Sequence, residues 1–409
     1  MFKIAIEQPV LNHALECLAG TVGNNSQNLG DDCISVTDNG DGTLSLFTSN
    51  GIDFSYIRVL TNQFNAQQGT PEVMPYVNFK RFRDIISTIP ETIIVTIESK
   101  VNNISIGYGS KKPINLTGST NGIIPLPKLA EDMLKNTNPG YELPDKSLYS
   151  ICKAAASIIT DSKMNSITDC INLKFDNGMV ISTGVDVPNS RMFHYDLKAS
   201  TNAKGNVLVN PNKLLKSSNL FMSKDFSTDV VFYSDNNCTG FIKDYAGNKN
   251  TFDIMETMFI THNINGTFPA NIENMFNGIN EYAEVNMDEL MNTLDRAKAI
   301  DDGTTASNVA HIEIASDTLK VDKRSQYGTV EDSIQLENQI NGKISDSFKI
   351  APLEQIMKLY KSVTPGTDFY IGEHSTPKGK YYVFKGDPGS TLEFLTTGFA
   401  SSNTNNINP

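Results

Sequence analysis

Three successive blocks of the chain, each roughly 130 to 140 residues long, repeat one order of predicted elements. In every block the pattern is strand, helix and three strands, twice over. Alternating apolar residues predict the strands, and apolar residues three and four positions apart predict the helices. Because each half-block places one amphipathic helix on one face of an antiparallel sheet, the predicted fold class is α+β.

The repeat predicts three tandem domains. We place them at 1–130, 138–275 and 280–400, with a flexible tail at 401–409. Polar segments rich in Asn, Pro and Gly, at 135–140 and 263–280, are typical of domain junctions.

Six helices are expected, one in each half-block. Pro9 suits the first turn of the first helix, and Pro90 ends the second. The predicted helices are 9–22, 80–89, 147–160, 212–222, 287–300 and 353–363.

Hairpins are predicted where a turn signal separates two apolar runs. In the first block the segment 38–42 joins strands at 33–36 and 44–47, and in the second Asn177-Gly178 joins strands at 170–175 and 179–183. In the third block, strands at 310–315 and 318–321 flank Ser316-Asp317, and another strand follows at 330–336.

The net charge of −12 argues at first against a nucleic-acid partner, because phosphate binding needs Lys and Arg. The predicted helices nevertheless hold more basic than acidic residues, which leaves the rest of the chain strongly acidic. An acidic exterior around a positive lining would repel DNA outside and favour it inside. The alternative explanation is that these Lys and Arg residues simply occupy solvated helix faces.

No pattern of catalytic, metal-binding or membrane-spanning residues is recognisable. The five cysteines are widely spaced without a CxxC pair, which favours reduced and mostly buried thiols, and the five histidines lack metal-ligand spacing. P-loop, GxSxG and Rossmann motifs are absent from the sequence. We therefore expect no enzyme activity, no metal, no cofactor and no membrane contact. The N-terminal sequence does not resemble a signal peptide, so a cytoplasmic location is expected.

The order of elements and several short strings resemble the bacterial DNA polymerase III beta subunit, the sliding clamp, over nearly the whole chain. STGVDVPNSRMFHY is similar to the family's T-D-G-H-R-L segment, with Asp186, Arg191 and Met192 at matching positions. GTFPANIENM is similar to G-R-F-P-D-Y and keeps Phe268 and Pro269. VNFKRFRDIISTIP has its counterpart in the family's first domain, and the third block matches by pattern.

The chain departs from the family in three places. The loop at 24–27 reads NNSQ where cellular clamps are usually basic, the segment between Asp186 and Arg191 is longer, and the C-terminus continues from Thr396 to Pro409 instead of ending in a short apolar tail. These departures indicate a divergent member, and we expect it to be encoded by a bacteriophage or mobile element.

The resemblance implies a replication processivity factor that encircles double-stranded DNA and tethers a DNA polymerase. It implies a homodimeric ring of six domains with the helices lining the channel, without sequence readout, because base contacts would stop sliding. It also implies that the polymerase and the clamp loader insert short peptide motifs into an apolar pocket between the second and third domains.

The resemblance and the charges together name three sets of residues. The residues expected to bind DNA are Lys80, Arg81, Arg83, Lys153, Lys213, Lys216, Arg296, Lys298, Lys358 and Lys361. The expected partner-peptide pocket comprises Val185, Met192, Phe268, Pro269 and Phe394, and the expected ring interface includes Leu116 and Ile300.

Two other functions remain open from the sequence. A structural ring or scaffold could use the same repeated fold without DNA, and it would not need its helix charges to converge on one face. An enzyme is a third candidate, and the lack of a catalytic constellation counts against it. The sequence also leaves open whether two or three chains form the ring.

Overall fold

The computed structural model describes seventeen segments of the chain, and every structural statement below concerns them. They are residues 3–23, 32–62, 72–120, 127–135, 140–143, 147–158, 170–186, 191–198, 205–216, 230–235, 237–245, 253–269, 272–304, 308–363, 366–376, 379–387 and 391–397. The chain forms two compact units. The first unit is Met1–Tyr149, Ala199–Ala203 and Asn212–Ile264, and the second is Ser150–Lys198, Lys204–Pro211 and Asn265–Pro409.

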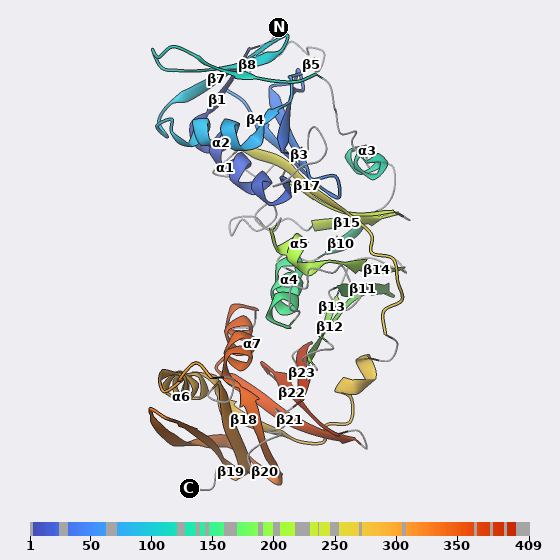
Figure 1. Cartoon of the computed structure of the whole chain (residues 1–409). Helices are drawn as coiled ribbons and strands as arrows, with labels where there is room; N and C mark the ends of the chain where they lie inside the picture. Colours follow the sequence, from blue (N-terminus) through green and yellow to red (C-terminus); the bar gives the residue numbers. More distant parts are fainter. Residues whose placement is uncertain are drawn as a thin grey trace. The chain divides into compact units, whose positions relative to one another are not determined.

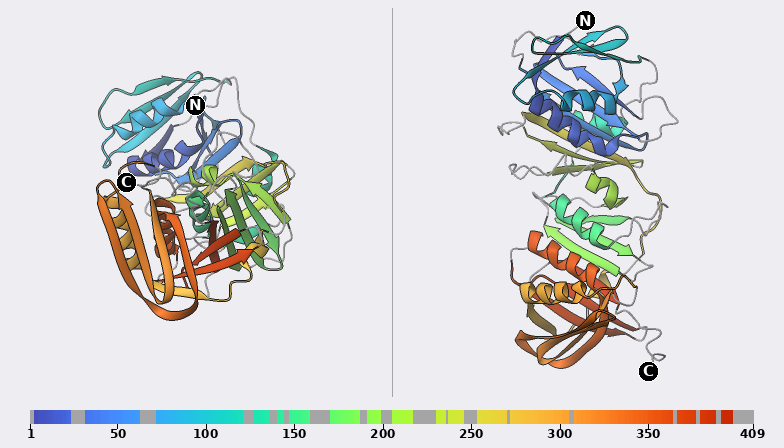
Figure 2. Two further views of the ribbon diagram at one scale, coloured as in Figure 1. Left: turned by 60° about the horizontal axis from the view of Figure 1, so that its bottom comes forward. Right: turned by 60° about the vertical axis from the view of Figure 1, so that its left-hand side comes forward.

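The first unit contains a pair of adjacent helices, α1 (Gln8–Leu18) and α2 (Phe79–Ser87), shown in Figure 2. Pro9 lies in the first turn of α1, as predicted, and the apolar face of that helix is buried. A four-stranded antiparallel sheet in this unit has the order β1 (Lys3–Glu7), β7 (Ile94–Lys100), β8 (Asn103–Tyr108) and β9 (Ile114–Thr117). Strand β9 therefore forms one edge of this sheet.

A second sheet of the first unit joins strands from the predicted first and second domains. Its order is β10 (Tyr141–Leu143), β15 (Val230–Ser234), β16 (Cys238–Asp244), β17 (Ile254–His262), β4 (Asp53–Leu60), β3 (Thr43–Ser49), β2 (Cys33–Asp38) and β5 (Glu72–Val73), and β6 (Val77–Asn78) pairs with β2. The two domains meet where β17 pairs antiparallel with β4, for example at Phe259 and Ser55.

The second unit repeats this arrangement. Its main sheet has the order β14 (Gly205–Val209), β11 (Ile171–Asp176), β12 (Met179–Asp186), β13 (Arg191–Lys198), β23 (Leu392–Thr397), β22 (Gly379–Lys385), β21 (Asp368–Thr376) and β18 (Tyr282–Asn286). Strands of the predicted second and third domains meet where β13 pairs with β23. Each large sheet therefore crosses a predicted domain boundary, which explains why the compact units divide the predicted second domain (Figure 1).

A long antiparallel ribbon of β19 (Val309–Ser325) and β20 (Gly328–Lys349) completes the second unit. The side chain of Asn338 fastens the ribbon to β18, because it donates to the carbonyl of Tyr282 at 2.7 Å and accepts from the N–H of Glu284 at 2.8 Å. Among the described strands, β18 and β20 are not paired through their backbones, and this side chain joins them instead.

The helices α6 (Met287–Ala299) and α7 (Ile350–Val363) pack together in the second unit. Tyr360 of α7 is fully buried, and its hydroxyl donates to the carbonyls of Phe384 and Leu392 at 2.8 and 2.6 Å. Its ring lies 5.6 Å from that of Phe394, edge to face. This contact anchors α7 on one face of the main sheet.

Most predicted elements are confirmed. All six expected helices are present, with α4 (Ser147–Ile158) and α5 (Pro211–Lys216) in the second block. The hairpin at Asn177-Gly178 is confirmed, since both residues have positive φ angles, 47° and 82°, as a tight turn of this kind requires. A further helix, α3 (Lys128–Leu134), was not predicted.

The prediction for the third block was wrong at Ser316-Asp317. The chain does not reverse there: β19 continues through an irregularity at Ser316, which has a φ angle of 56°, and the reversal comes after Ser325. The predicted strand at 330–336 belongs to β20. The predicted domain limits stay predictions, and the predicted tail at 401–409 lies outside the described residues. None of the described helices is long and apolar enough to cross a membrane.

Candidate functional site

The helix α2 presents the predicted basic residues of the first block. Lys80 and Arg81 are exposed in its first turn, and Asn78 caps the helix by accepting from the N–H of Arg81 at 3.0 Å. Arg83 is half-buried, with its guanidinium 5.8 Å from the centre of the Phe79 ring and 3.6 Å from Asp84. The three cations therefore emerge from one short helix.

The predicted basic residues of the second block have different surroundings. Lys213 of α5 lies 3.4 Å from the buried carboxylate of Asp53, which also accepts from the hydroxyl of Thr261 at 2.7 Å. Lys153 of α4 is half-buried. Lys216 belongs to α5, but its side chain lies outside the described part of the chain.

The predicted basic residues of the third block are all engaged by carboxylates. Glu354 of α7 is almost fully buried and lies 2.8 Å from the ammonium of Lys298 on α6 and 3.9 Å from that of Lys358. The helices also meet through an ion pair between Lys361 and Asp288. Arg296 lies 2.7 Å from Asp332 of β20.

The strand register divides the predicted partner pocket between two faces of the main sheet in the second unit. Val185 pairs with Met192, and Met192 pairs with Leu395, so these three side chains share one face. Phe394 points to the opposite face, where Tyr360 covers it. Adjacent residues of a strand face opposite ways, so the register separates Phe394 from Val185 and Met192 and brings Leu395 onto their face.

The described part of the segment between β17 and β18 covers the face that carries Val185 and Met192. The Phe276 ring lies 5.6 Å from that of His194, which follows Met192 on the same face. Further along, a β-carbon on Gly372 would lie 2.6 Å from Ile279, so this segment also passes close over β21. Phe268 is buried and Pro269 is exposed in the same segment.

A polar row that the sequence did not reveal runs beside these apolar residues. Cross-strand register aligns Thr183, His194, Glu393, Lys385 and Tyr370 on five successive strands. Lys385 forms an ion pair with Glu393 and lies 5.0 Å from the centre of the Tyr282 ring. Burial acts to lower the pKa of Lys385, but the hydrogen bond and charge of Glu393 outweigh it and raise that pKa. The row was not visible because its members come from strands far apart in the sequence.

The two predicted interface residues both lie close to sheet edges. Leu116 is half-buried on the edge strand β9. Ile300 is half-buried at the end of α6, and a β-carbon on Gly328, the first residue of β20, would lie 3.9 Å from it.

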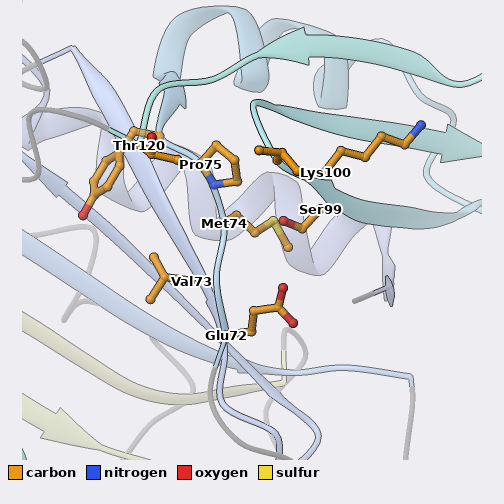
Figure 3. Close-up of a pocket in the computed structure, with 9 residues that line it drawn as sticks. Glu72, Val73, Met74, Pro75, Ser99, Lys100 and Thr120 are labelled. Atoms are coloured by element: carbon orange, nitrogen blue, oxygen red, sulfur yellow. The ribbon is translucent and has the colours of Figure 1, made fainter. Parts of the chain in front are cut away.

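A cavity of about 410 Å³ opens between β5 and the turn from β7 to β8 in the first unit (Figure 3). Glu72, Met74, Pro75 and Lys100 are among its lining residues, and Val101 at its rim is 86% exposed. No sequence pattern predicted it, because it forms where two sheets of one domain diverge.

Cys17 and Cys152 are buried free thiols. Burial raises the pKa of Cys17 and of Cys152 to about 12, so both are protonated thiols at neutral pH. Among the described residues, no group of three or more His, Cys, Asp and Glu side chains is arranged to hold a metal ion.

No protein-family model and no curated protein matches this sequence. The structure, in contrast, is similar to solved sliding clamps along almost its entire length. The DNA polymerase sliding clamp from Bacillus subtilis has a TM-score of 0.79 at 15% identity, with 97% of this chain and 98% of that chain covered. The chain has the three-domain fold of DNA sliding clamps.

Two further structures with this clamp fold carry bound molecules. The sliding clamp from Pseudomonas aeruginosa bound to griselimycin has a TM-score of 0.79 at 13% identity, covering 97% of this chain and 99% of that one. The Helicobacter pylori beta clamp bound to a DNA ligase peptide has a TM-score of 0.74 at 16% identity, covering 97% and 100%. The likeness is one of fold, and it extends over the whole length of each clamp.

Proposed function

We propose that the protein is a DNA sliding clamp, a processivity factor that encircles duplex DNA and tethers a DNA polymerase. The observation that carries this proposal is the match of the whole chain to the clamp fold, with nearly complete coverage on both sides. The function would require no catalytic residue, because a closed ring can leave DNA only by opening or by reaching an end. In this proposal the protein acts in the cytoplasm, the host's if a phage encodes it.

Ring closure would follow the rule by which the two large sheets are built. In each, the last strand of one half-domain pairs with the last strand of a half-domain from the neighbouring domain: β17 with β4, and β23 with β13. Two smaller sheets are not joined to a neighbouring domain in this way: the four-stranded sheet that ends in β9, and the ribbon of β19 and β20. An unpaired strand edge is a template for another chain. We infer that β9 of one protomer pairs with the segment 328–336 of β20 in the next.

The predicted interface residues fit this pairing. Leu116 lies on β9, and Ile300 lies beside Gly328, where the proposed acceptor strand begins. The contact is head to tail, and such contacts form a ring when the rotation between successive chains closes. A homodimer of six domains is the proposed ring.

Partner proteins would bind on the face that carries Val185, Met192 and Leu395, next to Phe268 and Pro269. This proposed pocket combines apolar side chains with a neighbouring polar row, as ligand sites commonly do. The Helicobacter pylori clamp with the same fold is bound to a DNA ligase peptide, which supports a peptide as the ligand. A DNA polymerase and a clamp loader are the proposed sources of such peptides.

The direct test uses DNA topology. The purified protein is loaded on nicked circular DNA, with a clamp loader if needed, and its retention is measured by gel filtration before and after the circle is cut. A clamp is retained on the circle and lost from the linear product. Loss from both forms, or equal retention on both, would contradict the proposal and favour a ring or scaffold without DNA.

A further inference from the structure

The ten predicted DNA contacts are not equally available to phosphate, and the ion pairs around them show a division between α2 and the α6–α7 pair. We propose that α2 supplies the main phosphate-binding surface through Lys80 and Arg81. This inference rests on the proposed clamp function. Glu354 is the residue that withholds Lys298 and Lys358 of the α6–α7 pair from DNA.

The cations of α2 and of the α6–α7 pair differ in their ion-pair partners. Lys298 and Lys358 share the carboxylate of Glu354, Lys361 pairs with Asp288, and Arg296 pairs with Asp332. At each of these cations a phosphate would compete with a carboxylate that already neutralises part of the positive charge. In the described part of the chain no carboxylate lies within 4.0 Å of the Lys80 ammonium or the Arg81 guanidinium, so both are available to a phosphate.

The charges of α2 and α6 also differ in how they relate to the helix dipole. The N-terminus of a helix carries a partial positive charge, so cations there are unfavourable and acids favourable. The helix α6 follows this rule, with Asp288 and Glu289 in its first turn and Arg296 and Lys298 in its last. Its charges are thus explained by helix stability. The helix α2 does the reverse, since Lys80 and Arg81 occupy a first turn that contains no acid.

An arrangement that opposes the dipole does not stabilise the helix, so helix stability does not explain these two cations, in contrast to the charges of α6. An anion approaching the α2 N-terminus meets two exposed cations and the positive end of the dipole together. The repeated, sequence-independent anion that the proposed function offers is the phosphate backbone of duplex DNA. The apolar face of α2 is held by buried Phe79, Phe82 and Ile86, which leaves the basic face outward.

Glu354 has no comparable explanation as a surface acid. It is only 3% exposed, and one of its oxygens, Oε1, has no hydrogen-bond partner among the described residues. A buried carboxylate is costly unless it is paired, so Lys298 and Lys358 are held to it. The third-domain helices would then offer a nearly neutral surface along which DNA slides with little resistance.

The test compares variants of equal charge change. Binding of a short fluorescent linear duplex is measured by anisotropy as a function of salt for Lys80→Ala/Arg81→Ala, for Lys298→Ala/Lys358→Ala and for Lys128→Ala/Lys135→Ala, a control pair on α3. Each phosphate contact contributes about 0.9 to the slope of log Kobs against log salt, so the α2 pair should lower the slope by about 1.8. The α6–α7 pair should lower it by less than about half of that, and the control pair should leave it unchanged within about 0.3.

A fourth variant, Glu354→Gln, tests the same inference because it should strengthen the salt-dependent binding of DNA. It removes the charge that holds Lys298 and Lys358, so it should steepen the salt slope. Equal losses from the α2 and α6–α7 pairs, or no gain from Glu354→Gln in a protein that melts normally, would overturn the inference. The clamp proposal would stand if the unmodified protein were still retained on nicked circles, whereas failure of that retention would overturn both.

Discussion

The ammonium of Lys298 on α6 lies 2.8 Å from a carboxylate oxygen of Glu354 on α7. The other helix-to-helix ion pair, Lys361 with Asp288, lies at the opposite end of both helices, so the two helices run antiparallel. One acid of the two is buried and the other is 59% exposed. The two ion pairs join the same two helices, and they differ mainly in the burial of the carboxylate.

Replacing Lys298 by Met should destabilise the protein by about 1 to 3 kcal/mol, because it leaves the buried carboxylate of Glu354 with only the more distant Lys358. Lys361→Met, the matched control, should cost less than about 1 kcal/mol, since Asp288 is hydrated. Urea unfolding of both variants measures the difference. Equal costs would mean that burial of Glu354 contributes nothing.

Glu256 should make stability fall as pH rises through the neutral range. Burial raises the pKa of this carboxyl to about 7 in the folded protein, and the nearby Asp244 adds to the effect while Arg58 opposes it. The unfolded chain releases the proton near pH 4.5, so between about 4.5 and 7 the folded state binds more protons, and raising the pH favours unfolding. The free energy of unfolding, measured at pH 5 and pH 8, should drop more in the parent than in Glu256→Gln. The same drop in both would exclude this residue as the cause.

Gly372 should not tolerate alanine. A β-carbon there would lie 2.6 Å from Ile279 and 2.8 Å from the Tyr282 ring, so the covering segment or β18 would have to move. The expected loss is about 1 to 3 kcal/mol in thermal or urea unfolding. Gly205, where a β-carbon meets nothing within 4 Å, is the control and should change stability by less than about 0.5 kcal/mol. A tolerated Gly372→Ala would place the covering segment further from β21 than described.

Substitution of Met192 should affect mainly partner binding, whereas substitution of Phe394 should affect mainly the stability of the fold. Phe394→Ala removes a fully buried ring beneath α7 and should cost about 3 to 5 kcal/mol. Met192→Ala should cost about 1 kcal/mol or less and weaken, by about tenfold, binding of the fluorescent DNA ligase peptide that the Helicobacter pylori clamp binds. Anisotropy titration and thermal melting give the two readouts. If the Met192→Ala protein binds this peptide as tightly as the parent does, the proposed pocket is not the peptide-binding site.

Leu116→Asp should weaken association between copies of the chain. A carboxylate on the β9 edge would be desolvated by the proposed pairing with β20, which should raise the dimer dissociation constant by at least about tenfold. Sedimentation at several micromolar concentrations compares this variant with Val101→Asp, which places the same charge on the exposed turn between β7 and β8 and not on β9 itself. Dimers of unchanged strength in Leu116→Asp would exclude β9 from the interface.

Local patterns were sufficient to predict the helices and most strands, because amphipathic periodicity and turn residues act over a few positions. They failed where distant pairing decides. Ser316-Asp317 looks like a turn, but β20 holds the strand extended past it. The separation of Phe394 from Met192 was not predictable, because the face on which a side chain of β23 lies depends on the register with β13. The α3 helix has only seven residues, too few for a clear periodic signal.

The candidate DNA-binding residues show the same limit. Composition identified the basic helices, yet it could not distinguish Lys80 from Lys298. The carboxylate that occupies Lys298 comes from Glu354, 56 residues further along the chain. Ion pairs of this range are visible only in three dimensions.

The sheets that cross the predicted domain boundaries have a consequence for synthesis on the ribosome. Strand β4 pairs with β17, and the hydroxyl of Thr261 donates to Asp53, 208 residues earlier in the chain. Half of the first large sheet therefore cannot pair with the other half until most of the second block has left the ribosome. Strand β13 likewise waits for β23 near the end of the chain. Such long-range pairing slows folding and leaves strand edges open in the nascent protein. A growing chain of this kind is expected to depend on chaperones until its last strand has been translated.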